Sequence, residues 1–238
     1  MKTYAFVFAR GGSKGLPRKN IRKLAGKPLL AYSIEQAEEI NAIDELFVST
    51  EDPAIAAVAL EYGANVIDRP AKLAQDDTPE WLAWQHAVEW IQKQGDLFDI
   101  FLSLPTTAPL RNSEDILGAL KKLDDRTDAV LTMTHAARSP WFNMVKKGRD
   151  EYIELLIQNK KKTHHRQDAP VVFDLTTVAY VTRPEFILSH DAIFEGRLRA
   201  VEIPRERALD IDTEMDLEIA EFLMQRQSGK KQLISDAK

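Results

Sequence analysis

Three glycines and four cations stand in one eleven-residue stretch near the N-terminus, Arg10–Asn20. Glycines let backbone N–H groups approach an anion closely, and Arg10, Lys14 and Lys19 can neutralise phosphate charge. The stretch follows an apolar run, Tyr4–Phe8, that has the composition of a buried strand. The pattern therefore predicts a binding site for a nucleotide triphosphate. The residues assigned to this site are Arg10, Gly11, Gly12, Ser13, Lys14, Lys19 and Asn20.

The spacing of this loop excludes the two commonest nucleotide motifs. It matches neither the P-loop, which ends in Gly-Lys-Ser/Thr, nor Gly-x-Gly-x-x-Gly. The alternative is an ordinary turn with solvated charges. A structural turn needs one or two glycines and has no use for so many adjacent cations, so we favour the phosphate site.

Two aspartates, Asp210 and Asp212, form the second chemical signal. They are two residues apart in a segment expected to be extended, where alternation points both carboxylates to one side. Two clustered carboxylates suit Mg²⁺ when substrate phosphates and water complete its octahedron. The alternative for Asp212 is a helix N-cap before Thr213. Capping accounts for one acid and leaves Asp210 unexplained.

A third segment, Leu104–Arg111, follows an expected strand and precedes an expected helix. Open α/β sheets bind ligands at the carboxyl ends of their strands, so this segment is placed at the site. Arg111 can equally be a structural residue that pairs with Glu114 or Asp115, and we assign it no catalytic role.

The elements that must position these residues alternate between strand and helix patterns. Strands are expected at Tyr4–Phe8, Glu45–Ser49, Ala64–Ile67, Ile100–Leu104, Ala129–Thr132 and Val178–Thr182. Helices are expected at Pro28–Ile40, Pro53–Tyr62, Pro79–Gln94, Ser113–Leu123, with Ser113 as the cap, and Thr213–Gln227. This alternation predicts an α/β fold with a mostly parallel sheet flanked by helices.

The strand and helix rhythm stops between residues 134 and 172, which we interpret as an excursion from the sheet. Trp141 and Phe142 are expected to be exposed there and to form a partner surface, with a local small core as the alternative. The main domain is then 1–133 with 173–227. The polar tail, 228–238, is expected to fray.

The composition of the chain excludes several classes of function. The chain of 238 residues has a net charge of −5, which argues against a nucleic-acid binder. It has no cysteine, which excludes disulfides and thiol catalysis. The N-terminal apolar run is too short for a membrane span, so we expect no membrane partner and a cytoplasmic location.

Taken together, the motifs resemble those of the CMP-sialic acid synthetases, or acylneuraminate cytidylyltransferases, and their relatives for other nonulosonic acids. The resemblance lies in Ala9-Arg10-x-x-Ser13-Lys14-Gly15-x-x-x-Lys19-Asn20, Pro109-Leu110-Arg111 and Asp210-Ile211-Asp212-x-x-x-Asp216. It implies a Rossmann-like, glycosyltransferase-A-like nucleotidyltransferase fold. It also implies a homodimer that transfers CMP from CTP to a nonulosonic acid for lipopolysaccharide or capsule biosynthesis, releasing pyrophosphate.

The resemblance also implies roles for particular residues. Arg10 and Lys14 would bind the triphosphate, Asn20 the nucleotide and Arg69 the cytosine. Asp210 and Asp212 would hold Mg²⁺, with Mn²⁺ as the alternative, and Asp212 or a metal-bound water would accept the proton of the sugar hydroxyl. The expected sugar-acid contacts are Arg166, Gln167, Thr106 and Tyr180, of which Arg166 would grip the carboxylate and could act in its own or the partner's site.

Two departures from the family leave the sugar open. Sialic acid enzymes usually carry glutamine where this chain has Pro105, and Asn-Gly where it has Thr176-Thr177. Such polar changes discriminate strongly between substrates. An eight-carbon acid, 3-deoxy-manno-octulosonate or its 8-amino form, is one alternative. A non-catalytic CTP-binding module is another.

Overall fold

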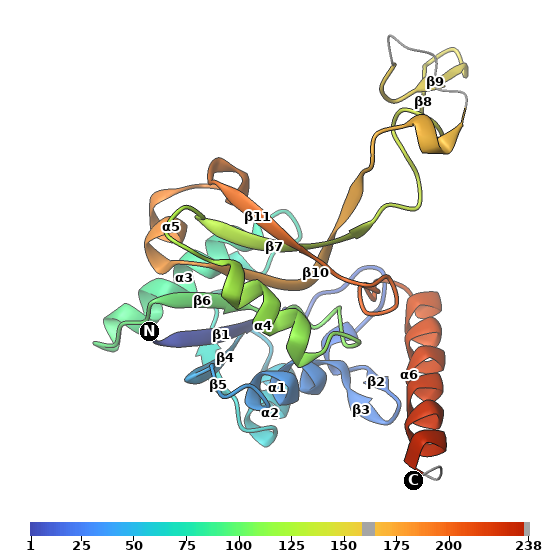
Figure 1. Cartoon of the computed structure of the whole chain (residues 1–238). Coiled ribbons are helices and arrows are strands. Elements are labelled where there is room, and N and C mark those ends of the chain that lie inside the picture. The colour runs from blue at the N-terminus through green and yellow to red at the C-terminus, as the bar shows by residue number, and fades with distance from the viewer. Residues whose placement is uncertain (159–164, 236–238) are drawn as a thin grey trace.

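The computed structural model describes residues 1–158 and 165–235. Within these residues the main sheet has seven strands, and every neighbouring pair is parallel except the two that involve β10 (Figure 1). The spatial order is β11 (Leu198–Glu202), β7 (Ala129–His135), β10 (Phe173–Thr182), β6 (Ile100–Ser103), β1 (Thr3–Phe8), β4 (Glu45–Thr50) and β5 (Asn65–Asp68). The expected α/β class with a mostly parallel sheet is confirmed.

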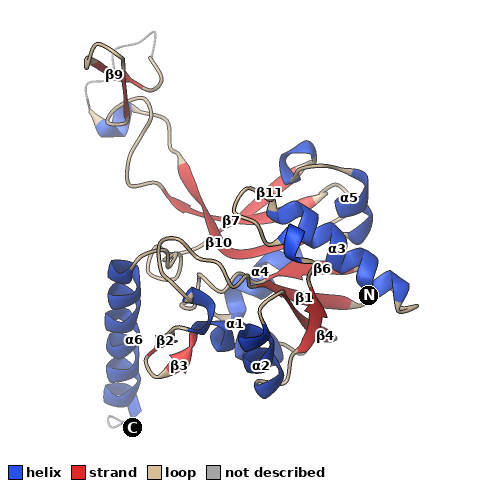
Figure 2. Ribbon diagram, turned by 180° about the vertical axis from the view of Figure 1, so that it is seen from behind, coloured by secondary structure: helices blue, strands red, loops and turns tan. Residues whose placement is uncertain are grey.

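Helices cover both faces of this sheet (Figure 2). Ala5 and Val7 of β1 face a core built with α1 (Leu29–Glu38), α2 (Pro53–Glu61) and α4 (Ser113–Lys122). Tyr4 and Phe6 face the opposite core, built with α3 (Glu80–Lys93) and α5 (Pro184–Ser189). This alternation is the period-two pattern of a strand buried on both sides.

Shorter elements complete the description. They are the hairpins β2 (Lys23–Leu24) with β3 (Lys27–Pro28) and β8 (Val145–Lys147) with β9 (Ile153–Leu155), and the 3₁₀ helices η1 (Lys19–Ile21), η2 (Ala71–Leu73), η3 (Arg166–Asp168) and η4 (Ile193–Glu195). In the part of the chain that the structure describes, no helix is both long enough and apolar enough to cross a membrane.

The segment between β7 and β10 leaves the sheet and carries the β8–β9 hairpin away from the body; we call it the arm (Figure 1). The two ends of the arm lie side by side, since His135 of β7 pairs with Phe173 of β10 in the sheet. Trp141 and Phe142 are half-buried at a turn in which the Ser139 carbonyl accepts the Phe142 N–H, so their expected exposure is wrong. The exposed apolar side chains of the arm include Tyr152 and Ile153.

Two helix termini differ from the sequence prediction. The cap of α4 is Asn112 rather than Ser113, because the Asn112 side chain accepts the Asp115 N–H at 3.1 Å and Asp115 accepts the Asn112 N–H at 3.1 Å. Helix α6 (Glu214–Ser235) continues past the predicted end at Gln227, so fraying from residue 228 is wrong for 228–235. No proline interrupts this stretch, and the run from Lys230 to Leu233 favours helix. Residues 236–238 lie outside the described part.

The sequence also missed elements at one edge of the sheet. Strand β11 and helix α5 were not expected, and β10 begins at Phe173 instead of Val178. The early part of β10 pairs with β7 up to Thr176 and resumes at Val181, with an irregularity between them. This break lies where β10 reaches the cavity described next.

Candidate functional site

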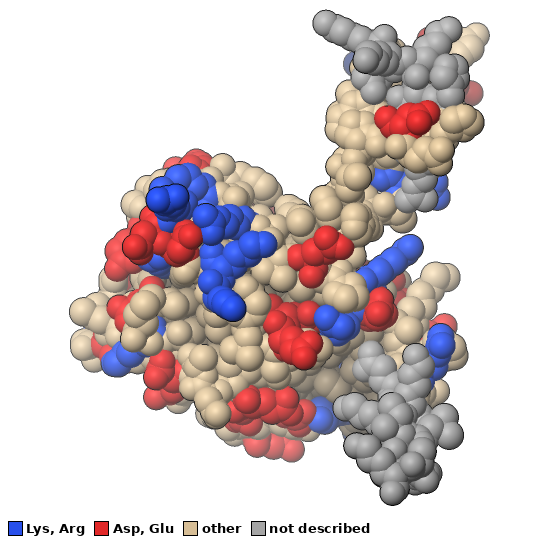
Figure 3. Space-filling view, in the orientation of Figure 1, with Lys and Arg blue, Asp and Glu red and all other residues tan. Residues whose placement is uncertain are grey.

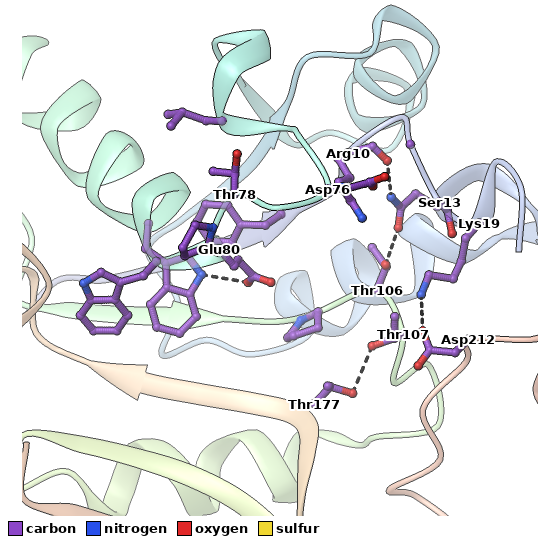
Figure 4. A pocket seen from close by; sticks show the side chains of 18 of the residues that line it. Arg10, Ser13, Lys19, Asp76, Thr78, Glu80, Thr106, Thr107, Thr177 and Asp212 are labelled. Atoms are coloured by element: carbon purple, nitrogen blue, oxygen red, sulfur yellow. Dashed lines mark hydrogen bonds and ion pairs between the residues drawn. The ribbon is translucent and has the colours of Figure 1, made fainter. Parts of the chain in front are cut away.

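A cavity of about 870 Å³ opens beside the carboxyl ends of β1, β5 and β6 (Figure 4). Five segments line it, namely the loop after β1, the segment from Arg69 to Trp84, the loop after β6, β10 with the loop after α5, and the segment before α6. Parallel strands bring their carboxyl ends to one edge, which is where such sheets bind ligands. The expectation that the motifs meet at this edge agrees with the structure.

The cations of the first loop are held by a carboxylate across the cavity. Arg10 Nη1 lies 2.7 Å from Asp76 Oδ1, and Lys14 Nζ lies 2.8 Å from Asp76 Oδ2. The hydrogen bond from Lys14, with a second from Arg10, holds the pKa of Asp76 below its ordinary value. Both cations are thus already drawn together around one anionic group, in the arrangement a phosphate would require.

Two glycines of this loop are required by close approaches. A Cβ on Gly11 would lie 2.5 Å from Asp52 Oδ2, and the Gly11 N–H donates to Glu51 Oε1 at 2.7 Å. A Cβ on Gly15 would overlap the carbonyl oxygen of Asp212. The loop therefore packs directly on the aspartate segment. Gly12 faces open space and lines the cavity, whereas Gly11 lies behind it.

Asn20 and Thr106 bind each other at the floor of the cavity. Asn20 Nδ2 donates to the Arg10 carbonyl at 2.9 Å, and Thr106 Oγ1 donates to Asn20 Oδ1 at 2.6 Å (Figure 4). Both side chains are buried. The pair fixes the loop after β1 against the loop after β6, a contact between residues 86 apart in sequence.

The two aspartates both line the cavity, and Ile211 between them is buried in the core, as the predicted alternation requires. Asp210 Oδ1 accepts from Thr177 Oγ1 at 3.1 Å, and Thr107 Oγ1 donates to Thr177 Oγ1 at 3.1 Å. Asp212 Oδ1 pairs with Lys19 Nζ at 2.8 Å. The Ile211 N–H also donates to the Thr107 carbonyl at 2.9 Å, so the segment is bonded to three other parts of the site.

Asp212 is not the helix cap that the sequence suggested as an alternative. Thr213 takes that place, because its Oγ1 accepts the Asp216 N–H at 3.3 Å while Asp216 accepts the Thr213 N–H at 2.8 Å. The Asp212 carboxylate is therefore available to the cavity.

Asp210 and Asp212 suit a hard cation, since both offer carboxylate oxygens from one short segment. Among the residues that the structure describes, no three His, Asp or Glu side chains cluster to form a complete metal site. Further ligands would have to come from a substrate and water, which is the usual arrangement for Mg²⁺ with phosphates.

Arg69 lines the cavity as a fixed group. Its Nε donates to Ser49 Oγ at 3.1 Å, and its guanidinium lies 5.6 Å from the centre of the Phe8 ring. Burial lowers its pKa. Arginine retains its charge at neutral pH even when buried, so Arg69 presents a rigid planar donor.

The end of the cavity opposite the cations is aromatic. Trp84 packs edge-on against Tyr180, with 5.7 Å between ring centres, and Trp81 lies 5.3 Å from Trp84. Burial raises the pKa of Tyr180 to about 12, so its hydroxyl stays protonated. Trp84 Nε1 donates to Glu80 Oε1 at 2.9 Å (Figure 4).

The sequence interpretation missed Glu80, Trp81 and Trp84. Aromatic residues at helical spacing behind a first-turn acid are typical of an ordinary core helix. The available signal was two tryptophans, Trp81 and Trp84, within the first five residues after Pro79.

One predicted sugar contact, Gln167, lies elsewhere, and a second, Arg166, is not tested. Gln167 lines a separate cavity of about 410 Å³ at the base of the arm, together with His135 and Arg138. The backbone of Arg166 lies in η3, and its side chain is outside the described part of the structure. Gln167 therefore does not line the main cavity.

Arg111 is structural, in agreement with its having no assigned catalytic role. It is buried, and it donates to Gln36 Oε1 and the Val178 carbonyl, each at 2.8 Å. Burial lowers its pKa to about 9. The suggested pairing with Glu114 or Asp115 gives no ion pair among the described residues, because Asp115 binds Arg207 at 2.9 Å and acts on Arg111 only through space.

Known proteins share this sequence pattern and fold. A family model described as cytidylyltransferase matches residues 4–234. A pseudaminic acid cytidylyltransferase of Campylobacter jejuni is 33% identical over 94% of this chain and 96% of its own length. A CMP-N,N'-diacetyllegionaminic acid synthase of the same species is 32% identical over 92% of this chain and 93% of its own length.

A solved structure extends the likeness to the fold. The structure of a CMP:2-keto-3-deoxy-manno-octonic acid synthetase complexed with CTP has a TM-score of 0.70, with 18% identity over 95% of this chain and all of that one. At this identity the match concerns the fold alone.

Proposed function

The chain belongs to the cytidylyltransferase family, and we propose that it transfers CMP from CTP to a nonulosonic acid and releases pyrophosphate. The observation that supports this most directly is the single cavity in which Arg10, Lys14 and Lys19 lie opposite the Asp210 and Asp212 carboxylates. Cations suit a triphosphate, and the acids suit its metal ion.

The reaction needs positioning and charge neutralisation more than a nucleophilic side chain. The anomeric hydroxyl oxygen of the sugar acid forms a bond to the α-phosphorus of CTP while the bond from that phosphorus to the bridging oxygen breaks. The leaving pyrophosphate gains negative charge. Arg10 and Lys14 stabilise this charge once Asp76 has released them.

Asp210 and Asp212 would hold Mg²⁺, or Mn²⁺ as an alternative. The ion, when bound, supplies charge stabilisation at the phosphates. Thr177 fixes the orientation of Asp210, and Lys19 holds Asp212. Arg69 and Asn20 are assigned to the nucleotide, and Thr106 and Tyr180 to the sugar end.

The sugar hydroxyl must lose a proton, and we assign its acceptance to Asp212. Near-normal turnover of Asp212→Asn at saturating Mg²⁺ would contradict this assignment. The variant keeps the size of the side chain, so a loss of turnover with intact CTP binding supports the role.

We further propose that the arm mediates a homodimer and brings Arg166 to the partner's cavity. The exposed Tyr152 and Ile153 supply apolar surface on the arm. Gln167, at the second cavity, would lie in the same interface. A monomer by light scattering at micromolar concentration would overturn this proposal.

We propose that the reaction takes place in the cytoplasm, as a step in the biosynthesis of a surface polysaccharide such as lipopolysaccharide or capsule, or of a modified protein.

The two alternatives are not favoured. Relatives at about one-third identity are named for nine-carbon acids, whereas the likeness to the octonic acid enzyme concerns the fold alone. A non-catalytic CTP-binding module would have no need for two carboxylates facing the cations in one cavity.

The test is pyrophosphate release from CTP and Mg²⁺ with a panel of pseudaminic, legionaminic, N-acetylneuraminic, deaminated neuraminic and octulosonic acids. Release with a nonulosonic acid, lost in Asp210→Ala, is expected. The matched control is Asp77→Ala, an exposed acid outside the cavity lining, which should retain activity. Release only with an octulosonic acid, or none with CTP binding intact, would overturn the proposal.

A further inference from the structure

The aromatic end of the cavity holds a carboxylate that the proposed chemistry does not use, that of Glu80. Its Oε1 accepts from Trp84 Nε1 at 2.9 Å. Within residues 1–158 and 165–235, its other oxygen, Oε2, takes part in no hydrogen bond or ion pair. Figure 4 shows this carboxylate directed into the cavity, on the side where Thr106 and Thr107 lie.

The position of Glu80 is fixed by the core. It is the first residue of α3, and the next residue, Trp81, donates from Nε1 to the His190 carbonyl at 2.7 Å. Trp84 packs against Phe101, with 5.1 Å between ring centres, as well as against Tyr180. The carboxylate is therefore held by a rigid helix start rather than by a mobile loop.

Among the described residues, Trp84 is the group that donates a hydrogen bond to Glu80. Glu80 is exposed to the cavity, and desolvation by the protein around its carboxylate raises its pKa. Arg69 is a nearby cation that interacts with Glu80 through space, while its printed hydrogen bonds within the described residues go to Ser49. Pro105, on the same cavity wall as Thr106, contributes only an apolar ring. A ligand that fills this end would displace the water on which Oε2 depends.

We propose that Glu80 selects the sugar acid by accepting a hydrogen bond from a neutral donor, a hydroxyl or an amide N–H, on the part of the sugar farthest from its own carboxylate. This inference rests on the proposed function. Like charges repel, so the carboxylate of the acid lies away from Glu80 and toward the cations. The indole rings of Trp81 and Trp84 then meet the apolar faces of the sugar chain.

Selection follows from the penalty for a carboxylate oxygen that loses its water when a ligand fills the cavity and gains no hydrogen-bond donor in exchange. A sugar acid that carries hydrogen in place of the donating hydroxyl or amide would exclude water from Glu80 without supplying a new hydrogen bond. Sites of this kind reject such analogues strongly. We expect the loss to be about 10- to 100-fold in kcat/KM, corresponding to one hydrogen bond to a charged group.

The experiment compares the wild-type chain with Glu80→Ala and Glu80→Gln, using an accepted acid and analogues that each lack one hydroxyl or amide N–H. One analogue should lose about 10- to 100-fold in kcat/KM with the wild type and under about 3-fold with Glu80→Ala. KM for CTP should stay within about 2-fold. Glu80→Gln, which retains an acceptor oxygen, should fall between the two.

The matched control is Glu89→Gln, an exposed acid on the same helix outside the cavity, which should behave as the wild type. A rise in KM for CTP with an unchanged KM for the acid would overturn the inference, because Glu80 would then contact the nucleotide. Equal losses of kcat/KM on every analogue in the wild type and in Glu80→Ala would also overturn the inference. A wild-type chain that turns over no acid would instead overturn the proposed function, and the inference with it.

Discussion

The two ends of the cavity are built in opposite ways. At the cationic end, Lys14 is 78% exposed and reaches Asp76 from a loop. At the aromatic end, Trp81 and Trp84 are buried and belong to a helix of the core. Exposed ion pairs exchange partners at little cost, whereas buried aromatic groups are fixed. The cationic end, to which we assign the triphosphate, is therefore adaptable, and the aromatic end, to which we assign selection of the sugar acid, is rigid.

The surface charge pattern is consistent with this division. Figure 3 shows acidic and basic side chains intermingled over the face in view, with no single sign dominating it. The net charge is −5, so an anionic substrate is attracted by the local cations and not by the molecule as a whole.

Removing a cation should have the largest effect. Arg10→Ala or Lys14→Ala should lower kcat/KM for CTP by about 10²- to 10³-fold, because each cation neutralises charge that develops on the leaving group. Steady-state pyrophosphate release measures this, with exposed Lys23→Ala as the control. A change confined to KM for the sugar acid would contradict the assignment of these cations to CTP.

Removing the hydroxyl that orients Asp210 should have a smaller effect. Thr177→Val deletes the 3.1 Å hydrogen bond to Asp210 Oδ1 and keeps the side-chain volume. We expect turnover at low Mg²⁺ to fall about 10-fold, as for other groups that orient metal ligands, and Thr177→Ser to restore it. A Mg²⁺ titration checks this; an unchanged dependence on Mg²⁺ would mean that Thr177 acts only in packing.

A substitution at Asp76 tests whether Arg10 and Lys14 exchange this carboxylate for the nucleotide at little cost. Asp76→Asn should lower KM for CTP by about 3-fold, because the nucleotide no longer displaces a carboxylate from Arg10 and Lys14. Competition binding with CTP measures the change. The neighbouring exposed Asp77→Asn serves as the control, and weaker CTP binding by Asp76→Asn would show that Asp76 assists the nucleotide instead.

The smallest expected effect concerns stability at the rigid end. Burial raises the pKa of Glu80, so folding favours its protonated form, and the ionised form destabilises the fold at neutral pH. Glu80→Gln should therefore raise Tm by about 2 °C at pH 8. The gain should vanish as the pH falls below the ordinary glutamate pKa of about 4.3. Thermal unfolding against pH checks this, and Glu89→Gln should show no such gain.

The sequence predicted the adaptable end far better than the rigid one. Arg10, Lys14 and the two aspartates stand in short motifs whose glycine and charge content has few other uses. Glu80 and Trp84 look like parts of a core helix, because the same apolar spacing serves packing. The contact between Asn20 and Thr106 joins residues 86 apart, and no local pattern encodes it. The strands of the sheet were predicted except for β11, whose alternation is weak.

The antiparallel pairing of β7 with β10 allows the length of the arm to vary between related chains. The arm starts at His135 and ends at Phe173, two residues that face each other across one ladder. Its length can therefore change by insertion or deletion without shifting the register of any strand. Yet β10 continues from the arm to Thr177 and Tyr180. A graft of another arm would therefore leave the register of the sheet intact, while any strain it placed on β10 would reach the cavity wall at Thr177 and Tyr180.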